Sequence, residues 1–193
     1  MSSPSLGHFF LPIKQIVLIL LILNAGYIFP LQAAPVAISD IIKATPYDQK
    51  LSRTGLLTFV PIPLLNEKES RSMESLFLRA KAFRYVKEGK GDIWQTPQET
   101  ERKGSGDCED KAVWLFYQLK QNGHENVRLV IGKYKSISAG YHVWVAYMDQ
   151  DSVSYILDPA TQKRIWKSND FPNEFYRPLY SFDGQNRYRH SSL

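Results

Sequence analysis

Cysteine is almost absent from this sequence: among its 193 residues there is one, Cys108. A single cysteine excludes an intramolecular disulfide, and it also excludes a structural zinc site built from several cysteines. Most free cysteines are buried and chemically inert, so the residues around Cys108 must decide whether it has a reactive role.

Long apolar stretches are also missing, because no stretch reaches the roughly 20 residues that a membrane-spanning helix needs. The nearest is the segment between Lys14 and Pro30, fifteen residues that include the polar Gln15 and Asn24. This pattern predicts a targeting segment over residues 1–33, either a signal peptide or a signal anchor with its basic end in the cytoplasm. In both cases the rest of the chain is exported: it is periplasmic, or it is anchored to the outer face of the cytoplasmic membrane. Membrane contact is then expected only through an uncleaved N-terminal segment.

Charge of one sign does not dominate the chain. There are 24 lysines and arginines against 19 acidic residues, a formal net charge of +5, and the hydrophobic and aromatic contents are 44% and 13%. These values are typical of a globular protein with a real core, not of a disordered chain. Solvated lysines and arginines explain the small excess. For an exported protein, nucleic acid is not an expected partner.

The first half of the sequence predicts a simple order of segments. Residues 34–66 contain four prolines and no clear hydrophobic period, which predicts an extended N-terminal segment with one short strand at 56–60. Residues 67–88 carry apolar side chains at helical spacing, which predicts an amphipathic helix that ends before Gly89. Residues 67–193 are then expected to form the single functional domain.

A short helix is expected just before the cysteine. Thr96 as N-cap and Glu99 three residues later form a capping box, and Gly104 supplies the stop. Trp94 and Gln95 lie immediately before this helix and are candidates for lining a site or donating a hydrogen bond to an oxyanion. A half-buried structural tryptophan is the alternative.

Cys108 itself lies at a predicted helix start. Asp107 suits the N-cap position, Asp110 completes a capping box, and apolar residues then recur at helical spacing up to Gly123. The free N–H groups and the dipole at such a helix start favour a thiolate over a thiol. The acidic neighbours, including Glu109, act against this by raising the thiol pKa. The helix dipole, a protonated histidine or a bound cation must offset them.

The pattern changes to β after that helix. Residues 127–134, 141–147 and 153–158 are rich in β-branched and aromatic side chains, which predicts three strands. Residues 171–193 are rich in Tyr, Phe and Arg without a clear period, and they are expected to wrap the domain surface.

The turn between the second and third strands brings a histidine and an aspartate together. If residues 149–151 form a three-residue loop, His142 directly faces Asp158, with Cβ atoms roughly 4.5–5.5 Å apart on one face. A carboxylate in that place can hold the imidazole in one tautomer. A two-residue loop would instead send the two side chains to opposite faces.

Three motifs resemble those of the transglutaminase-like superfamily of papain-type cysteine enzymes. They are Gly-x-Cys-x-Asp-x-Ala at 106–112, His-x-Trp-Val at 142–145 and Asp-Pro at 158–159. The lead-in Trp-x-Thr-Pro-x-Glu at 94–99 and the Asp-Cys-Glu-Asp sequence at 107–110 are more similar to one branch, the bacterial transglutaminase-like cysteine peptidases. The likeness covers about residues 70–182. It implies an α+β fold with a papain/transglutaminase-like core, in which helices of the N-terminal half include a Cys helix packed on an antiparallel sheet.

The resemblance also implies roles for particular residues. Cys108 is the nucleophile, His142 the general base and acid, and Asp158 the orienting carboxylate, with Sγ in hydrogen-bonding reach of one ring nitrogen. Asp107 and Glu109 match the branch's calcium-ligand positions, although an ordinary helix cap is the alternative. The chemistry itself requires no cofactor.

The function that this resemblance implies is that of an exported cysteine protease acting on a protein or peptide of the cell envelope. The same triad also serves a transglutaminase, a cell-wall amide transferase or an amidase. A non-catalytic binding module on the same fold is a further alternative.

Overall fold

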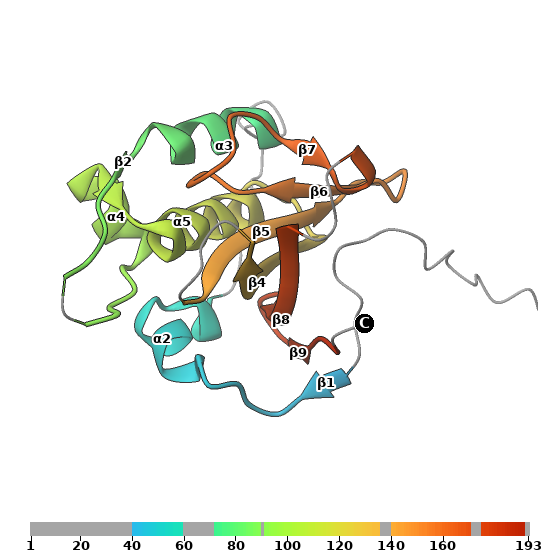
Figure 1. Ribbon diagram of the computed structural model, residues 1–193, viewed down its shortest axis with the longest axis horizontal. Coiled ribbons are helices and arrows are strands. Elements are labelled where there is room, and N and C mark those ends of the chain that lie inside the picture. The colour runs from blue at the N-terminus through green and yellow to red at the C-terminus, as the bar shows by residue number, and fades with distance from the viewer. Residues whose placement is uncertain (1–39, 60–71, 90, 136–139, 171–174, 192–193) are drawn as a thin grey trace, which may run out of the picture. The chain divides into compact units, whose positions relative to one another are not determined.

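Figure 1 shows the computed structural model of the chain, which describes residues 40–59, 72–89, 91–135, 140–170 and 175–191. The predicted targeting segment, residues 1–33, lies outside the described residues. Among the described helices, none has the length and the apolar character needed to cross a membrane.

The described part of the chain is built on one large antiparallel sheet. Its seven strands lie in the order β1-β9-β8-β4-β5-β6-β7. The strands are β1 Asp40–Ile42, β4 Val127–Tyr134, β5 His142–Met148, β6 Ser154–Leu157, β7 Trp166–Lys167, β8 Tyr176–Phe182 and β9 Arg187–Arg189.

Helices cover one face of this sheet. Helix α5 contacts β4 and β5, and α3 and α4 pack against α5 in turn (Figure 1). This arrangement confirms the predicted α+β fold with the Cys helix packed on an antiparallel sheet. The helices are α2 Asp48–Arg53, η1 Leu56–Thr58, α3 Met73–Ala82, α4 Pro97–Lys103, α5 Cys108–Gln121 and η3 Ser168–Asp170, and a separate parallel pair joins β2 Arg84–Tyr85 to β3 Ser105–Gly106.

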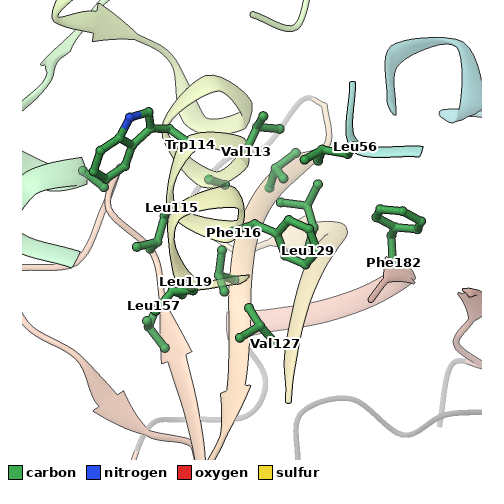
Figure 2. Packing of buried hydrophobic residues seen from close by; sticks show 14 of the residues in the cluster. Leu56, Val113, Trp114, Leu115, Phe116, Leu119, Val127, Leu129, Leu157 and Phe182 are labelled. Carbon is green, nitrogen blue, oxygen red and sulfur yellow. The ribbon is translucent and has the colours of Figure 1, made fainter. Parts of the chain in front are cut away.

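Helix α5 is buried on nearly every side. Phe116 and Leu119 point toward the apolar face of the sheet, whereas Trp114 points away from it (Figure 2). The Trp114 ring meets the Phe83 ring edge to face, with centroids 5.0 Å apart. A helix with buried side chains on opposite sides is held between layers. The position of its first residue, Cys108, is therefore fixed by the core.

The helix predicted over 67–88 ends earlier than expected, at Ala82. The apolar period continues beyond that point, but tertiary contacts decide the end. Lys111 of α5 donates through Nζ to the carbonyl oxygens of Lys81 and Phe83, at 3.2 and 3.0 Å. The chain then leaves the helix as β2, which pairs in parallel with β3.

The segment predicted to be extended is more structured than expected. A strand at 56–60 is wrong for the described residues, because Leu56–Thr58 form the 3-10 helix η1. Before it lies a short α-helix, α2, and Tyr47, Leu51 and Leu56 are all buried in the main core. Burial of these three side chains makes the segment part of the folded domain.

The prediction that residues 171–193 wrap the surface is wrong for the residues described there. Strand β8 lies inside the sheet between β9 and β4, with Tyr176 and Phe182 buried. Pro178 lies beside a register shift between Ile131 and Gly132 on β4. Proline is tolerated at such irregular positions, and there it hides the strand pattern from sequence reasoning.

Candidate active site

The register of β5 and β6 brings the predicted histidine and aspartate together. Met148 pairs with Ser154 and Val145 with Leu157, so the connecting loop has five residues instead of the expected three. His142 and Asp158 are therefore diagonal neighbours, and the predicted direct opposition is wrong. A register shift of two residues keeps both side chains on the same face, which is why the contact survives.

The His142–Asp158 pair is buried and tightly bonded. His142 Nε2 lies 2.6 Å from Asp158 Oδ2, and the two side chains are 1% and 0% exposed. Burial raises the pKa of the Asp158 carboxyl, but hydrogen bonds from His142, Thr161 and Tyr176 outweigh it, and the pKa is lowered. The aspartate is therefore ionised and Nε2 carries the hydrogen. The other ring nitrogen, Nδ1, is buried and has no hydrogen-bond partner among the described residues.

The start of α5 is held by Asp110. Its Oδ1 accepts the backbone N–H of Gln95 at 2.7 Å, and its Oδ2 accepts the backbone N–H of Asp107 at 3.3 Å. A Cβ on Gly106 would lie 2.4 Å from the Asp110 Cβ, so only glycine fits there. The acid that completes the predicted capping box therefore also fixes the turn before Cys108.

The Cys108 thiol makes no hydrogen bond with His142 among the described residues. Sγ donates to Glu109 Oε2 at 3.0 Å, and the predicted bond to a His142 ring nitrogen is not among the contacts of the described residues. Burial raises the pKa of the thiol, Glu109 raises it further, and the nearby backbone N–H of Val143 lowers it. The net pKa of the thiol lies above the usual range, opposite to the direction predicted from the helix N-terminus.

Three carboxylates meet beside the thiol. Glu88, Asp107 and Glu109 each offer one oxygen, and these atoms all lie within 4.8 Å of one another. Asp107 Oδ1 is buried without a hydrogen-bond partner among the described residues. Burial, followed by a hydrogen bond with the Asp107 side chain and by the charge of Asp107, raises the pKa of Glu109 to about 8. Clustered hard oxygen donors that repel one another are the donor set that Ca²⁺ takes.

Glu88 is the member of this cluster that sequence reasoning missed. It falls inside the segment expected to end a helix, and nothing in its spacing links it to Asp107. The parallel pairing of β2 with β3 brings it there, and the backbone N–H of Ile93 donates to its Oε2 at 2.7 Å.

Trp94 and Gln95 hold the segment that leads to α5. The Trp94 indole N–H donates to Asp92 Oδ1 at 3.1 Å, and the Gln95 amide N–H groups go to Asp110 Oδ2 and the Ser105 carbonyl. Both side chains are buried. Their donors are thus engaged in holding the approach to α5, and neither is open to an oxyanion in this structure.

Thr161 and Tyr176 are further residues that the sequence did not single out. Both hydroxyl groups donate to Asp158 Oδ2. A threonine three residues after an aspartate is a recognisable turn signal. Tyr176 carries no such signal, because it arrives from β8.

Comparisons with known proteins identify a fold that this chain shares with solved structures. No protein-family profile matches the chain, and no curated protein does. A solved structure of Legionella pneumophila LapG matches with a TM-score of 0.54 at 21% identity, covering 76% of this chain and 81% of that chain. Its calcium-bound form gives 0.54 at 21% identity over 77% and 84%, and its EGTA-treated form gives 0.55 at 21% identity over 77% and 80%. The described part of this chain therefore shares the α+β fold of LapG.

Proposed function

We propose that this chain is an exported cysteine protease that hydrolyses a peptide bond of a cell-envelope or surface protein. One observation carries the proposal: the buried His142–Asp158 pair leaves Nδ1 without a partner, next to a helix that begins with Cys108. An unpaired buried polar atom is destabilising and needs an explanation, and for a ring nitrogen in this position proton transfer is the explanation we propose.

The nucleophile is Cys108 in this proposal. The thiol exchanges its hydrogen bond with Glu109 for one with His142, whose Nδ1 takes the proton as the sulfur attacks the carbonyl carbon. Asp158 keeps the ring oriented through Nε2–H and stabilises the imidazolium that forms. Backbone N–H groups in the first turn of a helix have no partner within that helix, and those of α5 stabilise the oxyanion.

The second half of the reaction returns the proton. His142 Nδ1–H protonates the leaving amine as the C–N bond breaks, which leaves the acyl group as a thioester on Cys108. A water molecule then gives its proton to Nδ1 and attacks the thioester. The carboxylic acid product leaves, and the thiol re-forms with the proton from His142.

In this proposal, calcium binds to the carboxylates beside Cys108. Glu88, Asp107 and Glu109 would hold the ion through carboxylate oxygens, and the unpartnered Oδ1 of Asp107 supports that assignment. A bound divalent cation supplies positive charge that offsets the carboxylates around the thiol. One of the similar LapG structures is calcium-bound.

The proposal is tested by finding the bonds that the protein cleaves. The wild-type chain and Cys108→Ala are incubated with an envelope protein fraction, in Ca²⁺ or in EGTA, and new protein N-termini are labelled and identified by mass spectrometry. New N-termini are expected with the wild type in Ca²⁺. An unchanged set of N-termini, or the same new set with Cys108→Ala, contradicts a cysteine protease.

A further measurement separates hydrolysis from transfer of the acyl group to an amine. A fluorescent primary amine added to the reaction becomes attached to protein only if an amine replaces water as acyl acceptor, which would make the enzyme a transglutaminase.

Export is tested by mass spectrometry of the mature protein, whose N-terminus is expected near Ala34. An intact Met1 in the cytoplasmic fraction contradicts export.

A further inference from the structure

Asp158 is saturated with hydrogen-bond donors. Its Oδ2 accepts hydrogen bonds from His142 Nε2 at 2.6 Å, from Tyr176 Oη at 2.8 Å and from the Thr161 hydroxyl. Its Oδ1 receives the backbone N–H groups of Ala160 at 3.0 Å and Thr161 at 3.2 Å. A carboxylate offers about four lone-pair sites. Five donors therefore meet about four sites, and there is no room for a proton on this carboxylate.

Gln162 determines which way the Tyr176 hydroxyl points. The backbone N–H of Asp158 donates to Gln162 Oε1 at 3.2 Å, which fixes the amide oxygen on that side. Gln162 Nε2 is then the atom that faces Tyr176, and it donates to Oη at 3.2 Å. The phenol oxygen accepts this bond, and its one hydrogen is donated.

The acceptor of that hydrogen is Asp158. Thr161 Oγ1 lies 3.2 Å from Tyr176 Oη, whereas Asp158 Oδ2 lies 2.8 Å away. An ionised carboxylate is also the stronger acceptor of the two. The Tyr176 hydroxyl and the His142 imidazole thus share one carboxylate oxygen.

The Tyr176 ring is held independently of its hydroxyl. It is 2% exposed and packs against Tyr134 and Trp144, with ring centroids 4.8 and 5.1 Å apart. Phenylalanine would keep these contacts. The effect of the hydroxyl can therefore be separated from the effect of the ring.

We infer that Tyr176 is a positioning residue for the proposed reaction, acting on His142 through Asp158 Oδ2 with its hydroxyl aimed by Gln162. The inference rests on the proposed function, because it assigns the residue to the same triad. The hydroxyl stops the carboxylate from rotating and takes part of the charge of Oδ2. It thereby sets the strength of the bond that orients the imidazole.

Kinetics give the first test, with Tyr176→Phe compared against Tyr188→Phe. Tyr188 is a matched control, since its buried ring carries a hydroxyl that donates to Asp183 Oδ2 at 2.6 Å, on another part of the sheet. Tyr176→Phe is expected to lower kcat about tenfold, the usual size for one hydrogen bond to a charged group. KM is expected to stay unchanged, because the hydroxyl bonds to Asp158 and acts through His142. Tyr188→Phe is expected to leave both constants unchanged, and an unchanged kcat in Tyr176→Phe overturns the inference.

Nuclear magnetic resonance gives a test that does not depend on activity. The chain has four histidines, so ¹⁵N-histidine labelling with a His142→Gln reference assigns the His142 Nε2–H signal. This proton signal is expected to move downfield in Tyr176→Phe, because the charge on Oδ2 is shared among fewer donors. Tyr188→Phe is expected to leave the signal in place. Loosened packing alone would weaken the His142–Asp158 bond and move the signal upfield.

The outcomes separate the two proposals. An unmoved or upfield signal in folded Tyr176→Phe overturns the role of Tyr176. If that variant does not fold, Thr161→Val, which removes another donor from the same oxygen, must move the signal downfield, and no movement overturns the inference. Absence of thiol-dependent hydrolysis by the wild type refutes the proposed function, while the signal still decides whether Tyr176 acts on the pair.

Discussion

His142 Nε2 and Asp158 Oδ2 are 2.6 Å apart in a part of the domain where neither side chain reaches solvent. Such a pair is stabilising only while both partners are present, because removal of one leaves an unpaired charged or polar group buried.

Cys108→Ala is expected to abolish hydrolysis without unfolding the protein. Loss of a nucleophile that acts within a triad lowers kcat by about a millionfold in a comparable enzyme. Alanine is well tolerated in the first turn of a helix, and the thiol makes one side-chain hydrogen bond, to Glu109. Hydrolysis rates and a thermal melt followed by circular dichroism check both statements. Residual turnover near the wild-type rate contradicts Cys108 as the nucleophile.

Replacing His142 is expected to remove more activity than replacing Asp158. His142→Ala should remove about as much activity as Cys108→Ala, because the proton has no other acceptor. Asp158→Asn should remove less, about ten-thousandfold, since it disturbs the ring orientation and not the attack itself. Parallel kcat measurements on both variants give the order. Equal activity in Asp158→Asn and wild type contradicts the orienting role.

The contact between His142 and Asp158 was predicted from the sequence, although the predicted length of the β5–β6 loop is wrong. The loop between β5 and β6 was expected to have three residues and has five, 149–153. Inside it, the Asp149 side chain accepts hydrogen bonds from the Val153 backbone N–H and the Tyr155 hydroxyl. Side chains alternate with a period of two, so the shared face of His142 and Asp158 depends on parity and not on the exact loop length.

Glu88 and Tyr176 show what sequence reasoning could not reach. Both enter the site from segments distant in sequence, through the pairing of β2 with β3 and of β8 with β4. No local period records such a pairing. Cys108 was found because its own helix start carries the signal: a capping residue, a glycine turn and an apolar repeat.

Calcium removal is expected to destabilise the protein. If Glu88, Asp107 and Glu109 bind the ion, EGTA should lower the melting temperature, and added Ca²⁺ should restore it by mass action. Calorimetric titration should show weaker Ca²⁺ binding by Glu88→Gln. Glu74→Gln, in the first turn of α3, should bind as the wild type does. An unchanged melting temperature in EGTA, with no metal by elemental analysis, removes calcium from the proposal.

Without calcium, Glu109 is expected to make the stability fall as the pH rises. Its folded pKa is raised by burial, and then by Asp107, from 4.5 to about 8. Between these values the folded state binds a proton that the unfolded state releases, so the free energy of unfolding decreases with pH and the stabilisation is lost above about 8. Melting curves in EGTA from about pH 5 to about pH 9 should show the wild type losing stability relative to Glu109→Gln. Parallel curves contradict a raised pKa.

Gly106→Ala is expected to disturb the site through the helix start. The added Cβ would lie 2.4 Å from the Cβ of Asp110 and 2.6 Å from its Oδ2, and Asp110 is fully buried. Since Asp110 holds the backbone N–H of Gln95, neither group can move without breaking the turn before Cys108. Overpacking of this kind costs about 1–3 kcal/mol, which lowers the melting temperature by roughly 2–12 °C in a protein of this size.

A second glycine variant separates this clash from a general effect of losing glycine. A Cβ on Gly89 meets no atom within 4 Å, so Gly89→Ala should change the free energy of unfolding by less than about 0.5 kcal/mol. Gly106→Ala should also lower kcat, because the sulfur of Cys108 is displaced relative to His142, whereas Gly89→Ala should keep it. Thermal melts and hydrolysis rates of the two variants are compared side by side. Equal melting temperatures would show that Asp110 can move aside, and the close fit at Gly106 would then not be what fixes Cys108.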